Sequence, residues 1–232
     1  MKGYIYLYQR KIIPNFIKDF GITLLIYAAY ALLDTENSDL YSDLSSPLLT
    51  CAVIIPCYLI RICSIRKYYI APGVLCRYEE WEKWWLCQIK TVILFSATHS
   101  CFLTLLRFAT IALASGFTGA KMMDVAIMIT ANAICTFLCF TFTGLLHILL
   151  ADIASPMCAL TVTLSLSFLD FGLSSALVLF YLSRATLPSG MNLSEIALHC
   201  GIVAIPCVLL MLICGFFSGR RRMNGGYHAQ IS

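Results

Sequence analysis

The chain contains six apolar stretches, each long enough or nearly long enough to cross a lipid bilayer. A hydrocarbon core of about 30 Å requires roughly 20 apolar residues in an α-helix. The composition agrees, because 60% of the 232 residues are hydrophobic and 12% are charged, about half the charge of an average soluble domain. The sequence therefore predicts an all-α, polytopic membrane protein that forms one domain over residues 1–232. The six predicted transmembrane helices cover residues 17–33, 48–65, 91–115, 125–151, 156–182 and 196–217.

Lysine and arginine residues lie almost entirely on one side of this topology. They cluster before the first span, between the second and third spans and after the sixth, whereas Lys121 and Arg184 lie on the opposite side and Arg107 lies within a span. Loops rich in lysine and arginine stay in the cytoplasm. We therefore expect a multi-pass protein of the cell (plasma) membrane with cytoplasmic N- and C-termini. The net charge of +4 follows from this bias and does not indicate binding of nucleic acid.

Three further features are expected on the cytoplasmic side. Residues 1–19 mix tyrosines with basic residues, a pattern typical of an interfacial helix at the headgroups of the lipid bilayer. Residues 219–232 are expected to form a polar tail. The link between the fourth and fifth spans is short, and Ser155 followed by Pro156 is typical of a helix start. These two spans are therefore predicted to form an antiparallel hairpin, with Asp152 capping or pairing at its turn.

The loop between the second and third spans carries the most informative short pattern. The sequence RYEEWEKWWLCQIK fills residues 77–90, and large side chains recur there at three- and four-residue spacing on one helical face: Tyr78, Trp81, Trp85 and Ile89. We expect a short amphipathic helix at the membrane surface, with its tryptophans at headgroup level, that leads into the third span. It is either an aromatic membrane anchor or a docking element for a soluble subunit. The predicted docking residues are Arg77, Glu79, Glu80, Trp81, Glu82, Lys83, Trp84 and Trp85.

In this segment the chain resembles the membrane subunits of bacterial ATP-binding-cassette (ABC) exporters of the type-2 permease class. Small members of that class have six spans, an interfacial helix before the first span and a cytoplasmic helix between the second and third. That second helix often begins with an arginine followed six residues later by Lys-Trp-Trp, a pattern matched by Arg77, Lys83, Trp84 and Trp85. The resemblance covers the whole chain in topology and this segment alone in residues. The family helix is commonly richer in basic residues than the three glutamates here allow.

The resemblance implies a permease that works as half of a transporter. Two copies, or one copy and a related permease, would form a pathway lined at the dimer interface by the second and fifth spans. Each would rest on a separately encoded ABC ATPase subunit, with the helix at 77–90 as the coupling helix. The sequence holds no Gly-x-x-x-x-Gly-Lys-Ser/Thr phosphate-binding loop. ATP and magnesium would therefore be bound by the ATPase, and this chain would be a transport subunit without enzymatic activity or a directly bound cofactor. The exported cargo would be amphipathic: a bacteriocin-like peptide, an antibiotic or a lipid.

Arg107 and Asp170 are the two charged residues well inside the predicted spans. Charges there are costly and usually face a partner or a water-filled cavity. Counted along helices from Lys90 and Ser155, they lie at similar depths of about 26 Å and about 22 Å. We therefore predict an intramembrane charge pair that joins the third and fifth spans; direct contact of these residues with substrate is the alternative.

The other polar residues of the spans indicate packing rather than chemistry. His99 and His147 are expected to be hydrogen-bonded packing residues. Most of the 12 cysteines lie within spans, where a free cysteine packs as a small hydrophobic residue, and no metal site is predicted. The fourth span carries an amide and several hydroxyl groups that we expect to form interhelical hydrogen bonds: Asn132, Thr130, Thr136, Thr141 and Thr143.

Three other functions are compatible with a helical membrane protein. An ATPase-independent structural or immunity protein is the main alternative, and the presence or absence of an ABC ATPase gene beside this one would separate the two. An intramembrane protease is disfavoured, because Glu79 and Glu80 are followed by Lys83 and then Trp84, so the arginine of the Glu-Glu-x-x-x-Arg signature is missing. A secondary transporter would call for inverted repeats, and the sequence contains no internal repeat.

Overall fold

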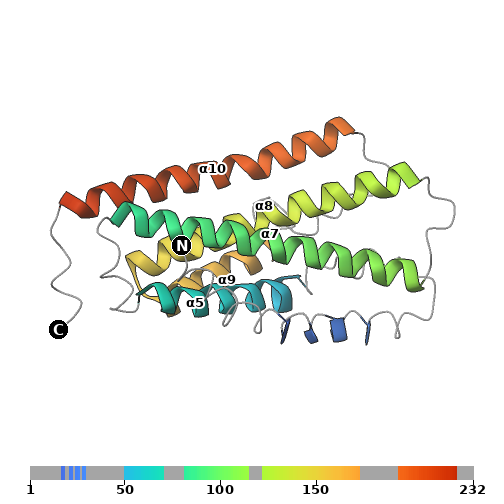
Figure 1. Cartoon of the computed structure of the whole chain (residues 1–232), viewed down its shortest axis with the longest axis horizontal. Coiled ribbons are helices and arrows are strands. Elements are labelled where there is room, and N and C mark those ends of the chain that lie inside the picture. Colours follow the sequence, from blue (N-terminus) through green and yellow to red (C-terminus); the bar gives the residue numbers. More distant parts are fainter. Residues whose placement is uncertain are drawn as a thin grey trace.

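The structure, a computed structural model, describes residues 17–18, 21–22, 24–26, 28–29, 50–70, 81–114, 122–172 and 193–223. The regular structure of these residues is helical throughout, without a strand (Figure 1). The predicted all-α fold is therefore confirmed for this part of the chain. The elements are the π-helical turn η2 (Thr50–Ile54) and the α-helices α5 (Ile55–Ile70), α7 (Trp81–Ala114), α8 (Met122–Ile153), α9 (Pro156–Gly172) and α10 (Leu193–Met223).

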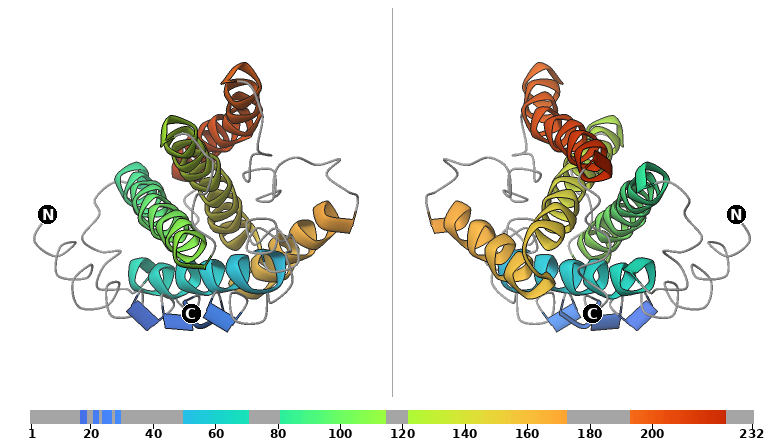
Figure 2. Two further views of the ribbon diagram at one scale, coloured as in Figure 1. Left: turned by 90° about the vertical axis from the view of Figure 1, so that its right-hand side faces the viewer. Right: turned by 90° about the vertical axis from the view of Figure 1, so that its left-hand side faces the viewer.

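Helix α8 is the centre of the bundle, because it packs against α5, α7, α9 and α10. The end-on views place α8 between α10 on one side and α5 on the other (Figure 2). Helices α7 and α10 also contact each other, and α5 contacts both α7 and α9. From Cys139 to Leu149, every residue of α8 except Leu146 is buried. The middle of α8 is therefore surrounded on all sides by other helices.

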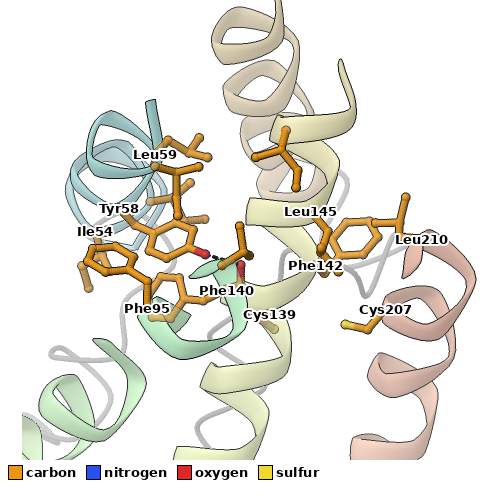
Figure 3. Close-up of a cluster of buried hydrophobic side chains, with 14 of the residues drawn as sticks. Ile54, Tyr58, Leu59, Phe95, Cys139, Phe140, Phe142, Leu145, Cys207 and Leu210 are labelled. Carbon is orange, nitrogen blue, oxygen red and sulfur yellow. Dashed lines mark hydrogen bonds between the residues drawn. The ribbon is translucent and has the colours of Figure 1, made fainter. Parts of the chain in front are cut away.

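The hydrophobic core extends to both sides of α8 (Figure 3). On one side, Tyr58 of α5 and Phe95 of α7 lie beside the α8 backbone near Phe140. On the other side, Phe142 of α8 faces Leu210 of α10. The core therefore joins helices from both halves of the described chain through α8.

Among the residues that the structure describes, two helices are long and apolar enough to cross a membrane. The segments are Lys83–Thr110 of α7 and Ile129–Ile153 of α8. At about 1.5 Å per residue they extend about 42 Å and about 38 Å, compared with a hydrocarbon core of about 30 Å. Two shorter apolar segments, Pro156–Leu169 and Cys200–Phe216, belong to the fifth and sixth predicted spans. The topology of six spans remains a prediction.

Helices α8 and α9 form the predicted hairpin. Pro156 is the first residue of α9. The side-chain oxygen of Ser155 accepts a hydrogen bond from the backbone N–H of Cys158 at 3.2 Å, and its carbonyl accepts one from the N–H of Ala159 at 2.9 Å. Ser155 therefore caps α9 by satisfying a donor that the first helical turn cannot satisfy itself.

The segment predicted to form a surface helix over 77–90 is part of a longer helix where the structure describes it. Residues 71–80 lie outside the described residues, and from Trp81 the chain continues in α7 to Ala114 without interruption. Neither glycine nor proline occurs between these two residues, so the backbone has no built-in break there. The expected short helix is therefore corrected to the first turns of one helix of 34 residues.

The two predicted terminal segments lie largely outside the described residues. Of the interfacial helix expected at 1–19, only Ile17 and Lys18 are described, and both are helical and exposed. The tail expected at 219–232 begins inside α10, which continues to Met223. The boundary between the last helix and the tail therefore lies at least five residues later than the composition indicated.

Candidate functional site

The bundle buries polar side chains beside its hydrophobic core and exposes large apolar ones. Twelve of the buried polar residues in the described part of the chain lie on α7 and α8: Gln88, Thr91, Ser96, His99, Ser100, Thr104, Arg107, Asn132, Thr136, Thr141, Thr143 and His147. The exposed side of α10 is aliphatic instead, with Leu198, Ile202, Ile205, Val208, Leu209, Leu212 and Ile213. A buried polar group is costly unless it is hydrogen-bonded. The candidate site therefore lies in the interior, where polar residues form three groups along the bundle.

The first group surrounds Tyr58 and joins α5, α7 and α8. The Tyr58 hydroxyl donates a hydrogen bond to the carbonyl of Phe140 at 2.8 Å and lies 2.8 Å from the Ser96 hydroxyl. Because the Tyr58 proton is used on the carbonyl, Ser96 donates in the second bond. The Tyr58 ring packs against Phe140 with ring centroids 4.7 Å apart and against Phe95 at 5.6 Å. His99 lies edge-on to Phe140 at 4.8 Å, so the group is aromatic with a hydroxyl pair at its centre; Figure 3 shows Tyr58, Phe95 and Phe140 of this group.

Gly144 provides the space that the Tyr58 hydroxyl occupies. A Cβ atom at this position would overlap that hydroxyl and would come within 2.7 Å of Cγ1 of Val92. Glycine is the residue that permits such a close approach to a backbone. Gly144 therefore leaves a notch in the surface of α8, and side chains of α5 (Tyr58) and α7 (Val92) pack into it.

The second group surrounds Arg107, whose side chain is 1% exposed. Nη1 of Arg107 donates to Oδ1 of Asn132 at 3.3 Å, and the hydroxyl of Thr104 donates to the same oxygen at 3.3 Å. One turn before Thr104 in α7, the Ser100 hydroxyl donates to the carbonyl of Ala133 at 2.6 Å. Nε of Arg107 has no hydrogen-bond partner among the described residues. A buried guanidinium group requires compensating acceptors, so Arg107 is the strongest candidate in the described bundle for contact with an anionic group.

The predicted partner of Arg107 is Asp170. Asp170 is part of α9, but its side chain lies outside the described residues, so the charge pair remains a prediction. Asn132 forms the interhelical hydrogen bond expected of it. Thr130 and Thr143 differ from expectation, because each donates to a carbonyl four residues earlier in its own helix. Such bonds satisfy the hydroxyl without joining two helices.

The third group lies near the end of α8 that leads into α9 and contains Cys63, Arg66, His147 and Asp152. Arg66 of α5 donates to Oδ1 of Asp152 in an ion pair whose side chains are 7% and 8% exposed. Sγ of Cys63 lies 3.0 Å from Nε2 of His147. His147 is therefore a hydrogen-bonded packing residue, and Asp152 pairs at the hairpin, as the sequence predicted. We call these four residues the Cys63 group.

The charged groups are spaced along α8 by about the thickness of a bilayer. Asn132, which binds Arg107, and Asp152, which binds Arg66, lie about 30 Å apart along the helix, the thickness of a hydrocarbon core. Residues 133–151 between them contain no aspartate, glutamate, lysine or arginine. The uncharged Tyr58 group lies between the two charged ones.

The predicted docking residues are only partly described. Arg77, Glu79 and Glu80 lie outside the described residues, as do the side chains of Trp81 and Glu82, although α7 begins at Trp81. Lys83 is exposed. The docking role predicted for these residues remains a prediction.

Trp84 and Trp85 lie in the interior and not at the surface. Each is 3% exposed, and their rings meet edge to face with centroids 5.8 Å apart. Gln88, one turn later, is also buried, whereas Lys83 and Leu86 are exposed. The expected headgroup level of the tryptophans remains a prediction, but Trp84 and Trp85 pack against the bundle and not against lipid. Neither ring is available to a soluble partner in this arrangement.

The sequence analysis missed two residues that organise the interior, Tyr58 and Cys63. Tyr58 places a polar hydroxyl within an apolar stretch of the sequence, and a buried tyrosine hydroxyl usually forms a hydrogen bond. Cys63 lies three residues before Arg66, and residues at this spacing share one face of a helix. The charge of Arg66 was therefore a signal that Cys63 lies on a polar face. Their partners could not be derived, because interhelical register depends on how the helices pack.

Comparison of the chain with models of protein families, with curated proteins and with solved structures finds no match.

Proposed function

We propose that the chain is a six-span permease subunit of an ATP-driven ABC export complex in the cell membrane, with both termini in the cytoplasm. The observation that carries the membrane part of this proposal is the burial of polar side chains together with the exposure of large aliphatic ones. Arg107, Asn132 and His147 are buried, whereas large aliphatic side chains of α10 are exposed. Water would penalise such an apolar exterior, but lipid solvates it and leaves the polar groups to find partners within the bundle.

The spacing of charges along α8 supports a transmembrane orientation of this helix. An uncharged stretch of about 30 Å fits a hydrocarbon core, and the ion pair of Arg66 with Asp152 then lies at the cytoplasmic boundary. That side is the one rich in lysine and arginine. The Arg107 group lies toward the opposite boundary, where a guanidinium with an unused Nε could meet an anionic group of an amphipathic cargo.

The export part of the proposal comes from the resemblance to type-2 ABC permeases. A second copy, or a related permease, would complete the pathway, and a separate ABC ATPase subunit would supply energy from ATP and magnesium. Because Trp84 and Trp85 are buried, docking would depend on the exposed Lys83 and on the charged residues of 77–82. We propose an amphipathic cargo, such as a peptide, an antibiotic or a lipid.

A pull-down in mild detergent tests this proposal. We expect the tagged chain to retain a soluble subunit of roughly 25–35 kDa with a phosphate-binding loop, identified by mass spectrometry. Reversal of Glu79, Glu80 and Glu82 to lysine should release that subunit or uncouple its ATP hydrolysis while membrane insertion persists. The matched control reverses Asp34, Glu36 and Asp39, which make the same charge change in the predicted outer loop. Retention of normal transport by the first variant would refute the docking role.

The burial of Trp84 and Trp85 favours a second candidate, an ATPase-independent structural or immunity membrane protein. If the tryptophan pair stabilises the bundle, the main residues shared with the permease motif have a purely structural explanation. A clean preparation of this chain alone in the same pull-down, repeated after chemical crosslinking in intact membranes, would favour this candidate over the exporter.

A further inference from the structure

The Cys63 group brings a thiol and an imidazole together near the end of the bundle. Sγ of Cys63 lies 3.0 Å from Nε2 of His147. Cys63 is half-buried and His147 is fully buried. Other cysteines have different partners: the thiols of Cys51 and Cys207 donate to backbone carbonyls. A backbone carbonyl only accepts a hydrogen bond, whereas a neutral imidazole has a ring nitrogen that can take up a proton during a reaction.

The surface of α5 around Cys63 changes from apolar to cationic along the helix. Ile60, one turn before Cys63, is 51% exposed, and Lys67, one turn after it, is exposed. Residues three and four positions apart lie on the same helical face, so Ile60, Cys63 and Lys67 form one stripe. An amphiphile with an apolar tail, a reactive centre and an anionic head matches this order. Long-chain acyl-coenzyme A has that arrangement, because its thioester lies between the acyl chain and a phosphate-bearing head.

We propose that Cys63 is a site of S-acylation, with His147 as its general base and a long-chain acyl-coenzyme A as the acyl donor. Sγ of Cys63 forms a bond to the acyl carbonyl carbon, and the bond from that carbon to the sulfur of coenzyme A breaks. The thiol proton passes to Nε2 of His147 and then to the leaving sulfur, which departs as free coenzyme A. No oxidation or reduction takes place. The proposal rests on the membrane placement given above, because the attached chain would extend past Ile60 into lipid.

The test measures acyl transfer to the purified full-length chain in detergent micelles, with palmitoyl-coenzyme A as the probe. Site-specific rates are followed by mass spectrometry of peptides. Cys158 is the internal control, because it is exposed at the start of α9, near the same end of the bundle. A helix N-terminus favours the thiolate, so Cys158 is a demanding comparison. We expect Cys63 to be acylated at least about tenfold faster than Cys158, although Cys158 is the more exposed thiol.

A substitution of the base provides the second measurement. General bases contribute about 10²- to 10⁴-fold in rate, so His147→Gln should slow acylation of Cys63 by about 100-fold and leave Cys158 unchanged. Wild-type protein in which Cys63 reacts no faster than Cys158 overturns the proposal, whether or not the variant folds. A folded His147→Gln protein with undiminished Cys63 acylation overturns it as well. The reaction requires no ATPase, so its failure can be distinguished from failure of the exporter assignment.

Discussion

Gly144 and Tyr58 share one small volume between α5, α7 and α8, and the fit can be tested by one methyl group. Gly144→Ala would place a Cβ on the Tyr58 hydroxyl and within 2.7 Å of Cγ1 of Val92. Overpacking of this kind costs about 1–3 kcal/mol, which would appear as a lower unfolding temperature in detergent. Gly201→Ala on α10 is the matched control, because nothing lies within 4 Å of its added Cβ. Equal stability of the two variants would contradict the notch.

The ion pair of Arg66 with Asp152 is the second residue-level feature with a clear energetic consequence. Removal of one partner from a buried pair leaves an uncompensated charge and costs about 3–5 kcal/mol. We therefore expect Asp152→Asn and Arg66→Gln each to destabilise the bundle strongly, as measured by unfolding in a denaturing detergent. The double variant should be less destabilised than the sum of the single variants. Additive losses would show that the two side chains do not act as a pair.

The predicted pair of Arg107 and Asp170 requires a double-mutant cycle. Side chains in contact couple by about 0.5–3 kcal/mol, whereas distant sites add within about 0.3–0.5 kcal/mol. We expect Arg107→Gln and Asp170→Asn to be coupled in their effect on unfolding. The positive control is Arg107→Gln with Asn132→Leu, since Nη1 of Arg107 binds Oδ1 of Asn132. If Arg107→Gln couples to Asn132→Leu but not to Asp170→Asn, the predicted charge pair of Arg107 and Asp170 is wrong.

At the scale of elements, the continuity of α7 is the feature that departs most from the sequence-based expectation. A hinge between a surface helix and a span would tolerate proline near Lys90, whereas an unbroken helix would not. Lys90 is exposed within α7, so Lys90→Pro should destabilise the bundle by about 3 kcal/mol or more. Lys90→Ala is the control for loss of the charge and should change stability by less than about 0.5 kcal/mol. If Lys90→Pro were as stable as the wild-type protein, that result would indicate a hinge near Lys90 and contradict a continuous α7.

Local signals predicted the α8–α9 hairpin well, and the same kind of signal misled at α7. Ser155 and Pro156 define a helix start through their own backbone chemistry, so the hairpin needed no knowledge of neighbours. The three- and four-residue spacing of tryptophans defines an apolar face but not what covers that face. Trp85 could meet lipid headgroups or the bundle interior, and only packing decides. The contacts of Tyr58 with Phe140 and of Cys63 with His147 likewise depend on interhelical register, which no single-helix pattern contains.

At the scale of the whole molecule, the exposed aliphatic side of α10 makes the strongest demand on the surroundings. Ile205 and Leu198 are 60% and 66% exposed, so lysine at either position would be nearly neutral in a water-soluble bundle. In a bilayer, lysine at the centre of a span costs about 2.5–3.5 kcal/mol, and lysine near an end can reach the interface. We expect Ile205→Lys to reduce membrane insertion and Leu198→Lys to have little effect, measured by alkaline extraction of membranes. Equal insertion would argue against a transmembrane α10.

The central position of α8 has a consequence for biogenesis. Helices α5 and α7 leave the ribosome before α8, so a nascent chain that ends before Met122 has made Tyr58 and Ser96 but not the Phe140 carbonyl to which Tyr58 donates. In that interval the notch of Gly144 does not yet exist, and Arg66 and Arg107 lack Asp152 and Asn132. Insertion factors or chaperones that shield polar residues in lipid would therefore be needed most during synthesis of the first half. Release from them should coincide with the emergence of α8.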